Sequence, residues 1–151
     1  KDRIRVINCR LQDLVPDDGR FDLIVSNPPY FIDSLKNPEP SKSNARHNGN
    51  LTQSDILESM EDLLAEIGRL QMIIPYAEGN IFIASAAGYG LYCNDILKIK
   101  PLPTSPVRRL ILSFSREKTK VTERFLVIEK GKRHDFTEDY VNLTKDFYLK
   151  F

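Results

Sequence analysis

The chain has 151 residues, of which 41% are hydrophobic and 28% are charged, and its formal net charge is only +1. This length suits one domain that buries a sizeable core, and the composition is ordinary for a globular protein. No apolar run approaches the ~20 residues that a membrane-spanning helix needs, so we expect no helix of this chain to cross a membrane.

The first fifty residues predict two strands and a long loop. Residues 3–9 (RIRVINC) alternate polar and apolar side chains, which predicts a short strand. Residues 21–26 (FDLIVS) are mostly apolar, which suits the middle of a parallel sheet with both faces covered. Residues 27–50 hold four prolines and no periodicity. They predict a loop of the length that is usually functional or disordered.

A helix is predicted after the loop. Thr52 or Ser54 can cap its N-terminus, and Gly68 is expected to end it. Between them the apolar residues recur at helical spacing, at Ile56, Leu57, Met60, Leu63, Leu64 and Ile67.

The rest of the chain predicts an α/β sheet with an antiparallel end. The expected elements are a strand at 70–74, a helix at 79–87, strands at 91–100, 107–115 and 121–129, and a short helix at 137–145. Gly88-Tyr89-Gly90 lies between a helix and a strand and lacks a third glycine, so it predicts a turn and no dinucleotide fingerprint.

The cysteines and histidines predict no metal site. Cys9 and Cys93 lie far apart, without the spacing of a disulfide framework or of metal ligands. They are expected to be reduced core residues of a cytoplasmic protein. His47 and His134 are equally isolated, each in a polar stretch.

The charges are unevenly spread along the chain. Residues 13–67 carry four Lys or Arg against eleven Asp or Glu, a balance of −7. Residues 96–133 carry eleven Lys or Arg against three Glu, a balance of +8. This asymmetry indicates a cationic face that could meet a polyanion. A solvated, lysine-rich surface would give the same pattern, so both interpretations stay open.

Asn27-Pro28-Pro29-Tyr30 directly follows the second predicted strand. Ligands of open parallel sheets bind beyond the carboxyl ends of the strands. The side-chain carbonyl of Asn27 and the main-chain carbonyl of Pro28 are two acceptors that can converge on one planar NH2 group. Tyr30 or Phe31 offers a flat face on which a base can stack, a contact worth roughly 1–3 kcal/mol. The segment therefore predicts a site for an exocyclic amine, with a proline-stiffened loop as the alternative.

Such a site favours attack by the amine on an electrophilic carbon. The adenine amine is a poor nucleophile because its lone pair is delocalised into the ring. Hydrogen bonds from both of its N–H groups to Asn27 and Pro28 would favour the localised, pyramidal amine of the transition state. Holding the amine in line with its electrophile supplies the rest, so no general base is strictly required.

The stretch FDLIVSNPPYF resembles motif IV of the S-adenosylmethionine-dependent amino-methyltransferases, whose pattern is (D/N)PP(Y/F). The preceding RIRVINCRLQDL is similar to the strand and acidic turn that come before this motif. The tail DFYLKF, residues 44–46 and PTSPVRRLILSFS resemble one subgroup, the bacterial tRNA1(Val) adenine-N6-methyltransferases, which modify the adenine beside the anticodon. The resemblance covers essentially the whole chain. NPPY alone is specific to the broad chemistry but not to the substrate.

The resemblance implies a class I methyltransferase fold, that is, a Rossmann-like α/β three-layer sandwich with a mixed sheet. It implies a cytoplasmic enzyme that methylates the N6 amine of a tRNA adenine, with S-adenosylmethionine as methyl donor and no metal. The target base would be flipped out of its stack to reach the site. The candidate residues are Asn27, Pro28, Pro29 and Tyr30 for catalysis, Asp13, Leu14 and Asn27 for the cofactor, and Phe31, Arg46, Arg108 and Arg109 for the substrate.

Several of these residues have a structural alternative. Asp13 also suits a turn or a helix cap, and Arg46 suits a solvated loop position. Arg108 and Arg109 could be one ion-pair partner and one exposed charge. We expect three aromatic residues to be core anchors of the last helix rather than base-stacking groups: Phe147, Tyr148 and Phe151.

The sequence departs from the family at its start. Family members begin with a glycine-rich loop for the methionine part of the cofactor, followed by an acidic residue for its ribose, and this sequence starts after both. We therefore expect residues 1–151 to be the C-terminal portion of the methyltransferase domain. The family's first strand lies beside residues 21–26, so we expect an open apolar edge there. A homodimer through this edge, for instance with residues 3–9 exchanged, is a prediction.

Two rival functions stay open. NPPY also serves N5 methylation of a protein glutamine, whose carboxamide NH2 replaces the adenine amine; RNA binding that falls steeply with salt would argue against it. The chain could instead be a non-catalytic RNA-binding fragment, which would melt cooperatively without binding the cofactor. DNA adenine methylation is less favoured because no separate target-recognition segment is visible.

Overall fold

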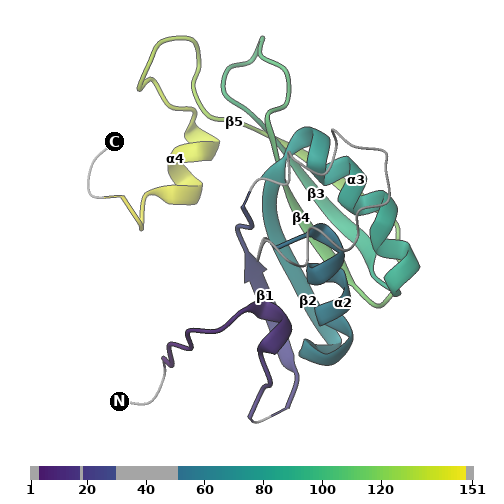
Figure 1. Ribbon diagram of the computed structural model, residues 1–151. Coiled ribbons are helices and arrows are strands. Elements are labelled where there is room, and N and C mark those ends of the chain that lie inside the picture. Colours follow the sequence, from purple (N-terminus) through teal and green to yellow (C-terminus); the bar gives the residue numbers. More distant parts are fainter. Residues whose placement is uncertain (1–3, 18, 30–50, 149–151) are drawn as a thin grey trace.

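The computed structural model describes residues 4–17, 19–29 and 51–148 (Figure 1). Their centre is a mixed five-stranded sheet in the order β1-β2-β4-β3-β5. β1 pairs with β2 and β3 with β5 in parallel, whereas β4 runs antiparallel to both of its neighbours. The strands are β1 (Phe21–Ser26), β2 (Leu64–Pro75), β3 (Tyr92–Lys100), β4 (Arg109–Ser115) and β5 (Thr122–Val127).

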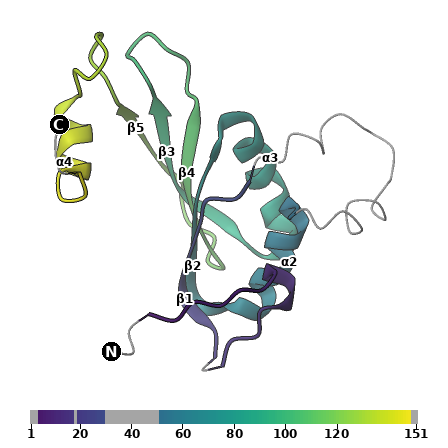
Figure 2. The same cartoon turned by 60° about the vertical axis from the view of Figure 1, so that its left-hand side comes forward.

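The longer helices cover one face of this sheet. Figure 2 views the sheet nearly edge-on, with α2 (Gln53–Leu63) and α3 (Tyr76–Ala86) on one side and the short α4 (Glu138–Thr144) on the other, beside β5. Two single turns of 3-10 helix, η1 (Leu11–Asp13) and η3 (Ala87–Tyr89), complete the described elements. The α/β class with a mixed sheet is confirmed. Among the described residues, α2 and α3 form the larger helical layer on one face of the sheet, and the short α4 lies on the other side.

The core lies between the sheet and α2 with α3. Alternate residues of the central strands point into it and are almost fully buried, because successive strand side chains face opposite ways. Phe82 of α3 meets Phe114 of β4 edge-on, with ring centroids 5.4 Å apart. The buried strand residues are Leu70, Met72, Ile74, Leu110, Leu112 and Phe114.

Both ends of α2 are satisfied by side chains. At its N-terminus, the Thr52 hydroxyl accepts a hydrogen bond from the Asp55 N–H at 3.1 Å, and the Asp55 carboxylate accepts one from the Thr52 N–H at 2.8 Å. This capping box identifies Thr52, and not Ser54, as the cap. At the C-terminal end, Arg116 of the β4–β5 connection donates to the carbonyls of Met60 at 2.9 Å, Glu61 at 3.3 Å and Leu64 at 3.3 Å.

The expectation that Gly68 ends this helix is wrong. α2 ends at Leu63, and Gly68 lies inside β2 where the β1–β2 register shifts between Phe21 and Leu23. A Cβ at Gly68 would lie 2.8 Å from the Phe21 carbonyl oxygen, so the glycine permits this close approach of the two backbones. Pairing with β1 therefore overrides the helical spacing of the apolar residues.

The strand predicted at residues 3–9 is also wrong over the described residues 4–9, which are irregular. Ile4 and Val6 are 87% and 90% exposed. A strand needs a hydrogen-bonding neighbour, and no described strand lies beside this segment.

β1 is an edge strand and not a central one, which corrects the expectation that both of its faces are covered. Leu23 and Val25, on the face away from α2, are 54% and 71% exposed. The predicted open apolar edge is thus present in the part of the chain that the structure describes.

Phe147 and Tyr148 are not core residues, so the expectation that they are core anchors of the last helix is wrong for these two. Phe147 and Tyr148 are 86% and 56% exposed, and Phe151 lies outside the described residues. Instead, the Phe136 and Tyr140 rings stack with centroids 5.3 Å apart, and the Thr137 hydroxyl donates to the Val127 carbonyl at 2.5 Å. The remaining elements form where predicted. Most of their ends differ by up to three residues, but the strand predicted at 70–74 begins six residues earlier, at Leu64.

Candidate functional site

A pocket of about 360 Å³ opens at the carboxyl end of β1. It is lined by Asn27, Pro28 and Pro29, which directly follow the strand, and by Ile73 and Arg109. This volume is in the range of small-ligand sites. The position beyond the end of a parallel strand is the usual one for a ligand in an open α/β sheet.

The sheet register brings Ile73 and Arg109 to this pocket. Ile73 of β2 pairs with Ile111 of β4, and Arg109 pairs with Pro75, so these residues share one face of the sheet. That face points away from the buried Leu110 and hence from α2 and α3. Two of the residues that line the pocket, Ile73 and Arg109, therefore have positions set by the hydrogen-bonded pairing of β2 with β4.

Arg109 and its neighbour Arg108 have different surroundings. The Arg108 backbone bonds at both ends, from its N–H to the Ile99 carbonyl at 2.9 Å and from the Tyr76 N–H to its own carbonyl at 3.0 Å. Its side chain is exposed, whereas that of Arg109 is half-buried and lines the pocket. Of Arg108 and Arg109, both predicted to meet the substrate, the structure brings only Arg109 to the motif.

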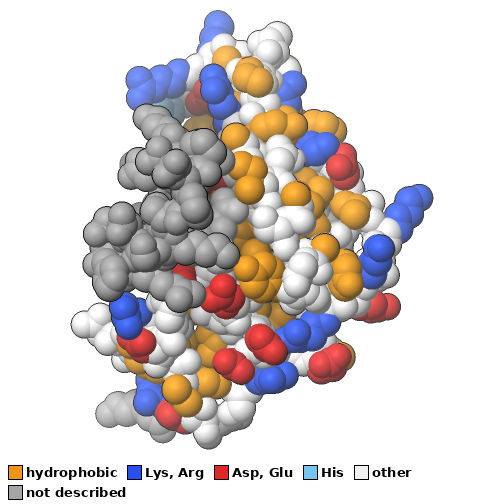
Figure 3. Space-filling view, turned by 45° about the vertical axis from the view of Figure 1, so that its right-hand side comes forward, with side chains coloured by type: hydrophobic (Ala, Val, Ile, Leu, Met, Phe, Trp, Pro, Cys, Tyr) orange, Lys and Arg blue, Asp and Glu red, His pale blue; other side chains and the backbone are white. Residues whose placement is uncertain are grey.

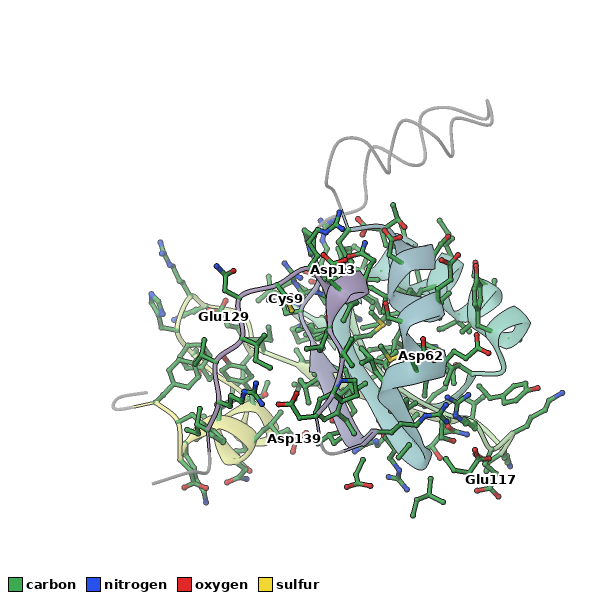
Figure 4. The ribbon with its side chains drawn as sticks, turned by 60° about the horizontal axis from the view of Figure 1, so that its bottom comes forward. Cys9, Asp13, Asp62, Glu117, Glu129 and Asp139 are labelled. Atoms are coloured by element: carbon green, nitrogen blue, oxygen red, sulfur yellow. The ribbon has the colours of Figure 1, made fainter. Side chains whose placement is uncertain are left out.

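Asp13 and Leu14 lie elsewhere among the described residues. Figure 4 shows Asp13 on η1, beside α2. Its carboxylate accepts hydrogen bonds from Arg10 at 2.8 and 3.0 Å, which lower the pKa of Asp13 and raise that of Arg10. Leu14 packs against the hydrophobic core. Neither residue lines the pocket, and Asp13 caps no described α-helix.

The remaining candidate residues cannot be placed relative to the pocket. Tyr30, Phe31 and Arg46 lie outside the described residues, as does His47. Ile73, by contrast, was not predicted as a site residue. In the sequence, Ile73 lies near the end of a predicted strand, two residues before Pro75. Only the register of β2 with β4 shows that the side of the sheet that carries Ile73 meets the pocket.

Cationic side chains lie at the same end of the sheet as the pocket. The loops at 101–108 and 128–137 both extend from this end (Figure 1). In the view of Figure 3, most visible acidic side chains lie in the lower half, whereas Lys and Arg side chains are visible in both halves. We call the following residues the basic rim: Lys100, Arg108, Lys130, Lys132 and Arg133.

Part of the +8 charge is neutralised within the sheet. Lys98 pairs with Glu123 at 2.6 Å and Arg124 pairs with Asp95 at 2.5 Å, both between β3 and β5. In the basic rim, Lys130 lies 3.7 Å from Asp135. The rim therefore keeps a cationic excess where the strands end.

The cysteines do not contribute to the pocket. Cys9 is exposed, which corrects the expectation that it is a core residue. Cys93 is half-buried, and burial raises the pKa of its thiol to about 11. No group of three side chains that could hold a metal ion occurs in the described ranges. Over the same residues, no helix has the length and apolarity that crossing a membrane requires.

The chain resembles a solved methyltransferase in fold. The crystal structure of a predicted O-methyltransferase, protein Atu636 from Agrobacterium tumefaciens, superposes with a TM-score of 0.58 over 83% of this chain and 51% of that one. Sequence identity is 21%, so this likeness speaks for the fold alone. It confirms the class I methyltransferase fold.

Curated relatives match the chain over nearly its whole length. Proteins named tRNA1(Val) (adenine(37)-N6)-methyltransferase are 36% identical in Trichodesmium erythraeum, 38% in Bacteroides fragilis and 38% in Flavobacterium psychrophilum. The matches cover 98–99% of this chain and 63–64% of the relatives. No protein-family model matches the chain. The resemblance seen in the sequence is confirmed, and the chain spans less than two thirds of the relatives' length.

Proposed function

We propose that this chain, a homologue of part of the tRNA1(Val) adenine-N6-methyltransferases, forms the amine-holding part of an enzyme that methylates the N6 amine of a tRNA adenine. The observation that carries the proposal is the pocket at the end of β1, where Asn27, Pro28 and Pro29 lie together with Arg109. This placement gives the Asn-Pro-Pro segment the concave surroundings that a nucleobase needs.

In this proposal, Asn27 and Pro28 hold the reacting amine. The Asn27 side-chain oxygen and the Pro28 carbonyl accept its two hydrogen bonds and favour the pyramidal amine of the transition state. Pro29 limits the backbone freedom of the segment and so keeps the two acceptors together. Tyr30 stacks on the flipped-out base. The anticodon loop is the proposed substrate because a loop base is already partly unstacked, which lowers the cost of flipping.

S-adenosylmethionine is the proposed cofactor, and it would supply the methyl group as an electrophilic carbon. The residues present fit one edge of its site. A carboxylate has about four lone-pair positions, so Asp13 can accept from the cofactor's adenine amine while it keeps its bonds to Arg10. In the proposal, Asn27 contacts the cofactor from the pocket, whereas Asp13 and Leu14, which lie outside the pocket, contact another part of the cofactor.

The basic rim is proposed to contact the tRNA backbone. Phosphate contacts position a nucleic acid without reading its sequence, which suits the side chains of the basic rim, all exposed except the half-buried Lys100. Arg108 belongs to this rim, and Phe31 and Arg46 are proposed to add contacts from the loop that follows the motif. The cytoplasm, where tRNA is available, is the proposed location.

Labelled methyl transfer tests this function. The intact protein that carries this chain would be incubated with radiolabelled S-adenosylmethionine and unmodified tRNA, followed by digestion to nucleosides. We expect the label in N6-methyladenosine and an uptake that falls steeply as salt rises, because the rim contacts are electrostatic. Label in glutamine of an added protein extract, with none in RNA, would replace this function by N5 methylation of glutamine.

A homodimer through the β1 edge is proposed for the isolated chain. β1 has β2 as its neighbour on one side of the described sheet, and Leu23 and Val25 are exposed on its face away from α2. Such an edge invites pairing with a second strand, and a charge placed on it blocks pairing. Light scattering should give twice the chain mass for the wild type and the chain mass for Val25→Lys. A wild-type monomer would remove the dimer and leave the edge to another part of a longer protein.

A further inference from the structure

We infer that Arg109 binds a phosphate of the target nucleotide itself, inside the pocket, whereas Arg108 contributes only to the general attraction of RNA. This inference rests on the proposed function and assigns separate roles to two adjacent arginines. It makes Arg109 the positioning residue that fixes how far the flipped nucleotide enters. The two roles differ because the Arg109 side chain lines the pocket, whereas the Arg108 side chain is exposed outside it.

The position of Arg109 is set by the sheet. It is the first residue of β4, where it pairs with Pro75 of β2, and its neighbours Arg108 and Leu110 point to other surroundings. Because a ladder residue cannot move without its partner strand, the base of the Arg109 side chain is fixed relative to Asn27–Pro29 across the pocket. A long side chain that starts from a fixed, half-buried base is suited to set a distance.

The chemistry of the pocket limits what Arg109 can bind. Asn27 and Pro28 present acceptors, which suit the amine of the base. A guanidinium presents five N–H donors and no acceptor, so any group of a ligand that it contacts must be an acceptor and cannot be that amine. The acceptors of an RNA nucleotide are its ring nitrogens, its ribose oxygens and its phosphate oxygens. The phosphate is favoured because it is charged and matches the fork of the guanidinium with two parallel hydrogen bonds.

The apolar wall supports this arrangement. Ile73 lies between the Asn27–Pro29 segment and Arg109 in the lining, and its face of β2 continues to Ile111 on β4. An apolar surface between an amine-binding end and a cationic end matches a nucleotide, whose ring lies between its exocyclic amine and its phosphate. Partial exclusion of water by this wall strengthens the ionic contact.

A single neutral phosphate in the RNA tests the inference. Stem–loop RNAs with the target adenine in the loop would carry a methylphosphonate at the phosphate on either side of that adenine or, as a control, at one in the stem. Dissociation constants would be measured by fluorescence anisotropy for the intact protein and for its Arg109→Ala and Arg108→Ala variants. Arg109→Lys serves as the second variant, because it keeps the charge and most of the side chain.

We expect Arg109→Ala to weaken binding of the unmodified RNA by about tenfold or more, as for other charged hydrogen bonds. On an RNA neutralised next to the target adenine, the same substitution should cost less than about twofold, because the contact is already lost. Arg108→Ala should weaken all RNAs by one common factor, as expected for a phosphate contact elsewhere. Arg109→Lys should recover part of the affinity but not all of it, because it lacks the fork.

Three results would overturn the inference. An Arg109→Ala penalty that is equal on every RNA would make Arg109 a part of the rim. A loss of S-adenosylmethionine affinity in Arg109→Ala, measured by calorimetry, with unchanged RNA binding would move Arg109 to the cofactor site. Failure of the wild type to bind any stem–loop would remove the proposed RNA substrate, and the inference with it.

Discussion

Asn27 and Arg109 lie far apart in the chain and line the same pocket. The sequence singles out the first of them, because Asn27 directly follows a predicted strand and ligands of open sheets bind beyond the carboxyl ends of strands. It predicts Arg109 less well. Arg108 and Arg109 are chemically identical, and which one points to the pocket depends on the β2–β4 register, which neither arginine encodes. Register is a property of two strands, so local patterns leave it open.

The two cysteines provide a prediction at the same scale. Cys9 is exposed, whereas burial raises the pKa of Cys93 to about 11. The thiolate is the reactive form, so iodoacetamide at pH 8 should alkylate Cys9 well before Cys93. In a Cys9→Ser variant the remaining alkylation should accelerate as pH rises towards 11. Because the folded pKa is raised, the stability that the neutral Cys93 contributes is present below about pH 9 and lost between about 9 and 11.

Mass spectrometry of the alkylated peptides measures both rates. The Cys93→Ser variant is the matched control, since it should keep the fast reaction of Cys9. Equal labelling of both cysteines at pH 8 would show that the strand carrying Cys93 opens readily, and the burial assigned to it would be wrong.

Helix α2 shows which parts of an element a sequence can specify. Its start is predicted because Thr52 and Asp55 form a local capping box. Its end is not, since Leu64–Ile67 continue the helical spacing and yet join β2. The choice is made by β1, which lies far away in the sequence and supplies the hydrogen bonds of a parallel ladder. The irregular residues 4–9 show the converse, because a strand pattern without a neighbouring strand forms no strand.

The capping box gives a prediction with a built-in control. Thr52→Ala should lower the free energy of unfolding by about 1 kcal/mol, because the Asp55 N–H loses its acceptor. Ser54→Ala, in the same turn but exposed, should change it by less than about 0.5 kcal/mol. Urea denaturation followed by circular dichroism measures both. If Ser54→Ala were the more costly substitution, Ser54 would be the cap in solution.

The other end of α2 depends on Arg116. Its guanidinium donates to three main-chain carbonyls at the end of the helix, an arrangement that links the β4–β5 connection to α2. Arg116→Ala should cost about 1.5–3 kcal/mol of unfolding free energy, as for hydrogen bonds to charged groups. Lys120→Ala is the control, since Lys120 is an exposed cationic residue of the same connection. Equal, small losses in both variants would mean that water replaces Arg116 at these carbonyls.

At the scale of the whole molecule, the fold class was predictable and the coverage of the sheet was not. The order of strands and helices along the chain indicates a mixed α/β sheet. Which face each helix covers, and which strand lies at the edge, depends on packing between distant elements. The apolar sequence of β1 predicts a central strand. In the structure β1 lies at the edge of the described sheet, and its Leu23 and Val25 side chains are exposed. The chain spans about 63% of the length of several curated relatives. In those longer proteins, further residues are available to cover the apolar side chains that are exposed on β1 here.

The distribution of charge is also a property of the whole molecule. The predicted contrast between an acidic and a basic region corresponds to different parts of the structure, with α2 in the acidic region and β3 to β5 in the basic one. Salt bridges between β3 and β5 neutralise part of the basic region, a pairing that no sequence count reveals. What remains lies at the end of the sheet where the pocket opens, which supports the proposed approach of an RNA backbone to the basic rim.

The measurement that tests the central claim most directly is the kinetics of methyl transfer to tRNA by Asn27→Ala in the intact protein. If Asn27 holds the reacting amine, kcat should fall by about a hundredfold or more, while the KM for tRNA changes by less than about twofold, because the interaction forms fully only in the transition state. Arg108→Ala should do the opposite, raising KM and sparing kcat. An Asn27→Ala enzyme with wild-type kcat would contradict the account, and the pocket at the end of β1 would not be where the amine reacts.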